Sequence, residues 1–143
     1  ENITCDFILR NQYRAGAKTE EDKYNTSYEF FKNIHNNPYT FCLRGGGNFS
    51  VRFYETLAMG RIPVLIDTDC QLPFFETINW SEHCLIVSEY EAEKLPQKLL
   101  DFHSNFSSED FLALQEKIRM LWQKRLTKEM FFQELAKHLN QIL

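Results

Sequence analysis

The segment with the clearest chemical potential is a glycine loop between an apolar run and a helix start. Arg44 is followed by Gly45, Gly46 and Gly47. Consecutive glycines let a ligand approach the backbone closely, and the unpaired N–H groups at a helix N-terminus attract anions. Since an apolar run precedes the glycines and a helix is expected after them, the pattern predicts an anion site at the carboxyl end of a parallel strand. A diphosphate would suit it.

Polar side chains after the glycines extend this predicted site. Arg44 and Arg52 would each offer a charged fork to phosphate oxygens, and Asn48 and Ser50 lie between them. Glu55 follows Arg52 by three residues, so both lie on the same side of the predicted helix. That helix is otherwise mostly apolar, and a carboxylate and a guanidinium buried there would need partners such as a ribose diol and a phosphate. The alternative is a surface ion pair between Arg52 and Glu55.

The glycines match neither of two familiar nucleotide-binding patterns. The phosphate-loop pattern G-x-x-x-x-G-K-[ST] is absent because no lysine follows, and the dinucleotide pattern G-x-G-x-x-G is broken by Ser50. A tight turn that needs positive φ would also select glycine without binding anything. The glycines alone therefore leave a structural turn open as an alternative to a ligand site.

Strands alternating with helices are expected to position these residues. Short strands are predicted at residues 5–9, 39–43, 62–66 and 84–87, and helices at 26–35, 51–59, 91–103, after Ser107 and from Lys128. The run at 62–66 is continuously apolar, as in a strand buried on both faces of a parallel sheet. Ser50 is expected to cap the second helix and Gly60 to end it. The sequence thus predicts one α/β domain over residues 1–143, a parallel sheet flanked by helices with a helical C-terminal tail.

Composition excludes several classes of function. The 143 residues carry a net charge of -4, which argues against nucleic-acid binding and against attraction to anionic membranes. No apolar run approaches the length needed to span a bilayer. The four cysteines have no zinc-site spacing, and Cys42 and Cys84 lie in apolar runs, so reduced structural thiols are expected.

Glycosylation sequons provide the expectation for cellular location. Five N-x-S/T sequences occur, at Asn2, Asn25, Asn48, Asn79 and Asn105. A glycan on Asn48 would occupy the predicted glycine loop. The sequence therefore predicts a cytoplasmic protein, bacterial rather than from a secretory lumen.

The central motif resembles the exostosin family of glycosyltransferases, glycosyltransferase family 47. The resemblance rests on R-G-G-G-N-F-S-x-R-F-Y-E-T-L-x-x-G-x-I-P-V from Arg44, on Leu72-Pro73-Phe74 and on Ile78-Asn79-Trp80, and it covers residues 39–102. It implies an inverting GT-B enzyme with two Rossmann-like domains, of which the C-terminal one binds the sugar donor, and no metal in catalysis. By this resemblance the chain is the donor-binding domain, and the N-terminal acceptor domain lies outside it.

The resemblance also implies roles for individual residues. Arg44 and Arg52 would contact the donor diphosphate and Glu55 the ribose of a nucleoside-diphosphate sugar, most simply a UDP-sugar. The acceptor would be a saccharide or another hydroxyl compound, no cofactor is expected, and the catalytic base would come from the missing domain. The isolated chain would therefore be inactive. The alternatives are a non-catalytic nucleotide-binding or interaction module and an α/β domain whose glycine turn is structural.

Two further groups of polar residues complete the candidate site. Asp67 and Asp69 form a D-x-D sequence directly after a predicted strand. In other glycosyltransferases this motif holds a metal, but after this strand a loop near the sugar is favoured, with no metal site. Arg10 and Arg14 follow the predicted strand at 5–9 and either reach the phosphates or remain solvated, and both possibilities stay open.

Overall fold

The computed structural model describes residues 2–142, without the side chains of residues 13, 14, 141 and 142. Three strands form a parallel sheet in the order β1-β2-β3: Tyr39–Cys42, Ile62–Asp67 and Leu85–Ser88. The helices are α1 (Glu20–Asn36), α2 (Val51–Ala58), α3 (Leu95–Ser104), α4 (Ser108–Leu121) and α5 (Lys128–Ile142). Short 3-10 turns cover Tyr13–Gly16, Trp80–Glu82 and Glu89–Lys94, and a π-helical turn, Trp122–Leu126, joins α4 to α5. The predicted α/β, Rossmann-like class is confirmed.

The central strand β2 is buried along its length, as its apolar sequence predicts. Residues from Ile62 to Ile66 are all buried, and only Asp67 at the carboxyl end is half-exposed. Neighbouring side chains of a strand point to opposite faces of the sheet. Cys42 meets Thr56 of α2, whereas the ring of Tyr39 packs against Phe102 of α3. Helices therefore cover both faces, which a parallel sheet requires.

The helix α2 links the sheet to the C-terminal helices. Its side chains Phe53 and Leu57 are almost fully buried and belong to one core cluster with Ile118 of α4. Gly60 adopts φ +62°, and a Cβ there would lie 3.2 Å from the Cβ of Arg119. The predicted left-handed helix end at Gly60 is confirmed, and the close passage of α4 gives glycine a second reason to stand there.

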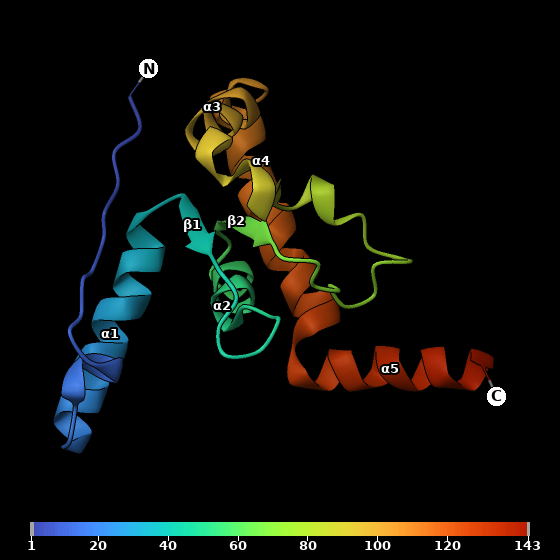
Figure 1. Cartoon of the computed structure of the whole chain (residues 1–143). Helices are drawn as coiled ribbons and strands as arrows, with labels where there is room; N and C mark the ends of the chain where they lie inside the picture. The colour runs from blue at the N-terminus through green and yellow to red at the C-terminus, as the bar shows by residue number, and fades with distance from the viewer. Residues whose placement is uncertain (1, 143) are drawn as a thin grey trace.

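The N-terminal region differs from the prediction. No strand forms at residues 5–9, because Phe7 and Leu9 are 71% and 91% exposed and find no apolar surface to cover. The segment instead runs beside α1, where Asp6 accepts hydrogen bonds from Asn33 and from Asn37 (Figure 1). The helix α1 also starts six residues earlier than expected at Glu20, because Thr19 and Asp22 form a reciprocal capping box.

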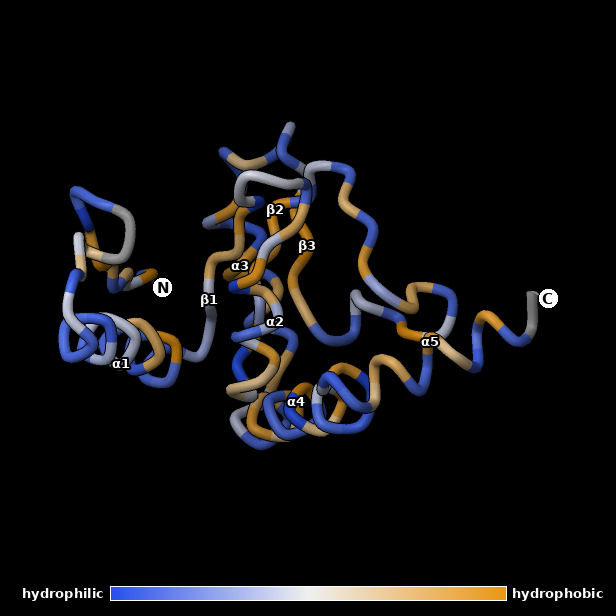
Figure 2. The backbone as a smooth tube through the Cα atoms, turned by 90° about the horizontal axis from the view of Figure 1, so that it is seen from below, coloured by the Kyte–Doolittle hydropathy of each residue, from blue (hydrophilic) through white to orange (hydrophobic). Residues whose placement is uncertain are grey.

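The two terminal helices lie at opposite ends of the molecule. Both views place α1 on one side of the sheet and α5 on the other (Figures 1 and 2). The apolar stretches of the chain gather between them, around β2, β3 and α2 (Figure 2). All four cysteines are free, and Cys42 and Cys84 are buried in the core, as expected for structural thiols. Within residues 2–142, no helix combines the length and the apolar character that crossing a membrane requires.

Candidate functional site

The glycine loop connects the carboxyl end of β1 to the first turn of α2. Gly45 donates its N–H to the carbonyl of Phe49 at 3.0 Å, which closes the loop. None of the three glycines has positive φ, which among the described glycines is confined to Gly16 and Gly60. The positive φ that the structural alternative invoked is therefore absent at these three glycines.

Packing explains only the last of the three glycines. A Cβ on Gly47 would lie 2.9 Å from the ring of Phe49, whereas a Cβ on Gly46 would meet nothing within 4 Å. On Gly45 the nearest atom would be the Phe49 carbonyl oxygen at 4.0 Å. The fold itself thus has no need of glycine at positions 45 and 46. What glycine provides there is a backbone that an external group can approach closely.

The first turn of α2 faces this loop. Ser50 is buried and is the N-cap residue, as predicted, yet its hydroxyl makes no capping hydrogen bond. Phe53 donates its N–H to the Ser50 carbonyl at 3.3 Å. The N–H groups of the two residues before Phe53 accordingly lack the usual side-chain cap, and they can donate to an anion.

Asn48 ties the glycine loop to the loop after β2. Its amide nitrogen donates to the carbonyls of Thr68 and Asp69 at 3.0 and 3.1 Å, and its oxygen accepts from the Thr68 hydroxyl at 2.6 Å. The two predicted halves of the site are therefore in direct contact. The Asn48 amide is engaged in this bridge in the structure described, and its predicted contact with a diphosphate stays a prediction.

The two arginines of the predicted site are both exposed. Among the described side chains neither Arg44 nor Arg52 forms an ion pair. The guanidinium of Arg52 lies over the ring of Phe30 from α1, 5.2 Å from its centroid, a geometry that orients a cation without neutralising it. Both positive charges remain available at the same edge of the sheet.

Glu55 lies half-buried one turn along α2. Burial raises the pKa of its carboxyl, and the nearby charge of Arg52 opposes this increase. No Arg52–Glu55 ion pair forms between these described side chains, so the surface-pair alternative for them is not observed. A half-buried carboxylate without a partner would gain from hydroxyl donors such as those of a ribose.

The D-x-D residues lie at the carboxyl end of β2. Asp67 accepts the N–H of Cys70 at 3.2 Å, and Asp69 has φ +61° with its carbonyl held by Asn48. Asp67 is thus partly used in shaping its own turn. Within the described residues, no group of three or more histidine, cysteine or acidic side chains is arranged to hold a metal ion.

Arg10 precedes α1 and packs against that helix, not at the carboxyl edge of the sheet. It donates to the Thr26 carbonyl at 3.0 Å and pairs with Glu29 at 2.7 Å. The expectation that it follows a strand converging on the phosphates is wrong, because the strand is absent. Arg14 lies in a 3-10 turn, and its side chain falls outside the described part of the structure.

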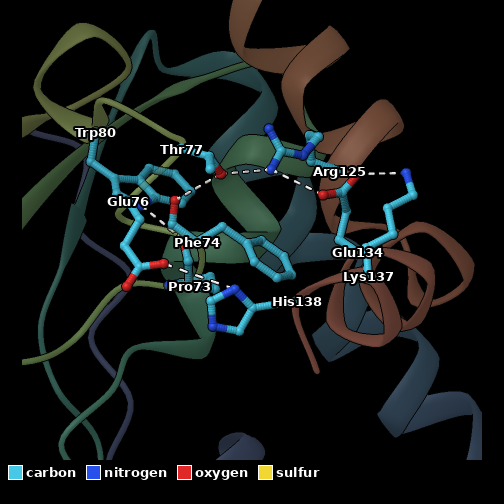
Figure 3. Close-up of polar contacts among 9 residues, drawn as sticks. All are labelled: Pro73, Phe74, Glu76, Thr77, Trp80, Arg125, Glu134, Lys137 and His138. Carbon is cyan, nitrogen blue, oxygen red and sulfur yellow. Dashed lines mark hydrogen bonds and ion pairs between the residues drawn. The ribbon is translucent and has the colours of Figure 1, made fainter. Parts of the chain in front are cut away.

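The loop that follows Asp69 was not predicted in detail. Phe74 has φ +52°, and its carbonyl accepts the N–H groups of Thr77 and Ile78 at 2.9 and 2.8 Å. Trp80 donates to the Pro73 carbonyl at 3.0 Å (Figure 3). Its ring also packs edge-on against Phe53 of α2. The sequence signal for this loop was the L-P-F and I-N-W strings, which gave no geometry. A hollow of about 490 Å³ is lined by residues 75–80 and another of about 290 Å³ by residues of α3 and α4, and the glycine loop lines neither.

Comparison with known proteins finds that the chain is similar to Exostosin-1 proteins of several animals. The chain is 34% identical over 107 residues to Exostosin-1 of Bos taurus, which covers 71% of this chain and 14% of that protein. It is 32% identical over 123 residues to Exostosin-1b of Danio rerio, covering 84% and 16%. To the Exostosin-1 homolog of Caenorhabditis elegans it is 39% identical over 86 residues, covering 59% and 22%. The chain thus corresponds to less than a quarter of the length of these relatives.

These relatives correct the expected cellular location. They are animal proteins, so the expectation of a bacterial, cytoplasmic protein is wrong. The sequon at Asn48 excludes no compartment, because such a sequence shows that a glycan can be attached and not that one is.

The family assignment agrees with the motif and the fold. In a comparison with protein-family models, residues 3–101 match the Exostosin GT47 domain. This match includes the glycine loop, α2, the whole sheet and the loop that contains Trp80. The chain therefore belongs to the exostosin family of glycosyltransferases, glycosyltransferase family 47.

Proposed function

We propose that this domain binds the nucleoside-diphosphate sugar, most simply a UDP-sugar, from which the enzyme transfers the sugar to an acceptor hydroxyl. The observation that carries the proposal is the pair of glycines, Gly45 and Gly46, that the fold itself does not require. They lie at the carboxyl end of a parallel strand and before a helix N-terminus, where α/β proteins bind phosphates.

Each polar group of the site has a role in this proposal. Arg44 and Arg52 neutralise the diphosphate, and the N–H groups of the first turn of α2 donate to its oxygens. These donors stabilise the negative charge that develops on the leaving diphosphate during transfer. Glu55 accepts hydrogen bonds from the ribose hydroxyls, and the loop with Asp67 and Asp69 borders the sugar.

The rest of the enzyme supplies what this domain lacks. We propose a GT-B arrangement in which an N-terminal domain of the same protein provides the acceptor contacts and the base. The reaction then inverts the anomeric centre and extends a polysaccharide, and the isolated domain is inactive. Neither the binding of the sugar donor nor the transfer of the sugar uses a metal or another cofactor.

Titration of the full-length protein with UDP in a calorimeter tests this proposal. Arg52→Met is expected to weaken UDP binding about 10- to 100-fold, because a charge-assisted hydrogen bond contributes roughly 1.5–3 kcal/mol. Glu55→Gln should weaken UDP more than it weakens inorganic diphosphate, since its partner is the ribose. Arg10→Met is the matched control, because Arg10 already pairs with Glu29 of α1. A full-length protein that folds and does not bind UDP would refute the donor-binding function.

A further inference from the structure

The turn from Phe74 to Ile78 needs support from outside itself. Phe74 and Asp69 are not glycines, yet both have positive φ, a conformation that most side chains avoid unless the surroundings impose it. Phe74 is the pivot of the turn, since its carbonyl accepts the N–H groups of Thr77 and Ile78. A bulky residue in this conformation indicates that other parts of the fold hold it.

That support comes from the C-terminal helices. The guanidinium of Arg125, in the π-helical turn between α4 and α5, lies over the Phe74 ring at 5.6 Å from its centroid. Phe131 of α5 packs against the same ring, with 5.2 Å between the centroids. Figure 3 shows the Phe74 side chain beside Arg125, with the planar group of the arginine directed toward Thr77 and Glu134.

Arg125 is itself fixed in position. It donates to the Thr77 hydroxyl at 2.9 Å and pairs with Glu134 of α5 at 3.3 Å. The Nε of Arg125 is buried and has no hydrogen-bond partner, which costs free energy. The contacts of the terminal nitrogen with Thr77 and Glu134, and of the guanidinium with the Phe74 ring, offset that cost. Arg125 thereby contacts two residues of the turn, the ring of Phe74 and the hydroxyl of Thr77. Its pair with Glu134 connects both to α5.

The turn from Phe74 to Ile78 belongs to the segment that borders the candidate donor site. Asn48 joins the glycine loop to Thr68 and Asp69, at the start of that segment. Trp80, at its end, contacts Phe53 of α2 and donates to Pro73. The chain from Thr68 to Trp80 is therefore held at three places, by the glycine loop, by α2 and by Arg125.

We propose that Arg125 is a positioning residue of the donor site: from the π-helical turn it holds residues 68–78 in the conformation that meets the glycine loop. The inference rests on the proposed function, because it names the device that orders the sugar-side border of that site. The π-helical turn sets the direction in which α5 leaves α4, and so where Phe131 and Glu134 stand beside Arg125.

Amide hydrogen exchange of the full-length protein, with and without UDP, tests this inference. In Arg125→Met we expect exchange at Thr77 and Ile78 to accelerate at least tenfold more than exchange in β2, which reports global opening. Arg125→Lys should not restore protection, since lysine keeps the charge but lacks the planar fork. Phe131→Leu, which keeps most of the volume, should give a similar but smaller effect. Lys137→Ala, which removes only an exposed partner of Glu134, is the control and should change nothing in the turn.

The effect of UDP separates positioning from mere structural support. In the wild-type protein UDP should slow exchange in both the glycine loop and residues 68–78, and in Arg125→Met only in the glycine loop. Equal protection of residues 68–78 in wild type and variant would overturn the inference, as would unchanged exchange at Thr77 and Ile78. Absence of UDP protection in the wild-type glycine loop would instead contradict the donor-binding function, so the two failures are distinguishable.

Discussion

Gly46 and Gly60 differ in what the fold requires of them, and substituting each by alanine separates a binding role from a structural one. At Gly46 an added Cβ meets nothing within 4 Å and φ is not positive. At Gly60 φ is +62°, and the added Cβ would lie 3.2 Å from Arg119 and 3.3 Å from the Gln115 carbonyl oxygen. The two substitutions are chemically identical but should affect different properties.

The magnitudes follow from these surroundings. Gly46→Ala should leave the free energy of unfolding unchanged or raise it by up to about 1 kcal/mol, because alanine restricts the unfolded chain. Gly60→Ala should lower it by about 1–3 kcal/mol, since alanine pays roughly 1–2 kcal/mol for the left-handed conformation and α4 must move as well. For a chain of this size the loss corresponds to a fall in melting temperature of roughly 3–10 °C.

Binding should show the opposite pattern. A methyl group on Gly46 would stand between the backbone and the diphosphate, so we expect UDP affinity to fall at least tenfold, or about 1.4 kcal/mol. Gly60→Ala should bind UDP within twofold of wild type at a temperature where it is folded. Thermal unfolding and calorimetric titration with UDP measure the two properties. If Gly46→Ala keeps full affinity, or loses stability as Gly60→Ala does, the glycines do not serve a ligand.

Three further outcomes follow from the structure. In the native protein an alkylating reagent at pH 8 should modify exposed Cys5 before Cys42 or Cys84, because burial raises the pKa of each of the latter thiols to about 12; mass spectrometry of digested, labelled protein reads the order, and early labelling of either buried thiol would show an open core. Burial, reinforced by the charge of a nearby lysine, lowers the pKa of His83 from 6.5. The unfolded chain therefore binds a proton below pH 6.5 that the folded chain resists, so the free energy of unfolding should fall as pH drops through this range, and His83→Gln should remove that part of the slope in denaturant titrations; an identical slope in the variant would refute this assignment. Asn48→Ala removes three hydrogen bonds between the two loops and should cost about 1–2 kcal/mol of stability and weaken UDP severalfold, whereas unchanged UDP affinity would mean that the bridge does not order the site.

The central part of the fold was predictable from sequence because its signals are local. The apolar run that forms β2 has no polar interruption. The helix before it begins directly after Ser50 and ends at Ala58, shortly before Gly60, close to the limits that these two residue types predict. The strand predicted at residues 5–9 failed because an apolar run forms a strand only where a neighbouring surface buries it. Phe7 and Leu9 have no such surface in the structure.

The candidate site was predictable as a set of residues but not as an arrangement. Spacing alone put the glycines, Arg52 and Glu55 at one edge of the sheet. The hydrogen bonds from Asn48 to Thr68 depend on how the glycine loop and the loop after β2 are placed relative to each other. No sequence pattern encodes that placement. The contact between Arg125 and Phe74 joins residues 51 positions apart in the sequence. It depends on a π-helical turn that has no clear sequence signal.

The most direct test of the donor-binding function is the location at which UDP protects the full-length protein from amide hydrogen exchange. We expect protection at residues 43–55, the glycine loop with the first turns of α2, and at residues 67–70 after β2. Protection confined to other parts, such as the hollow lined by residues of α3 and α4, would contradict the account.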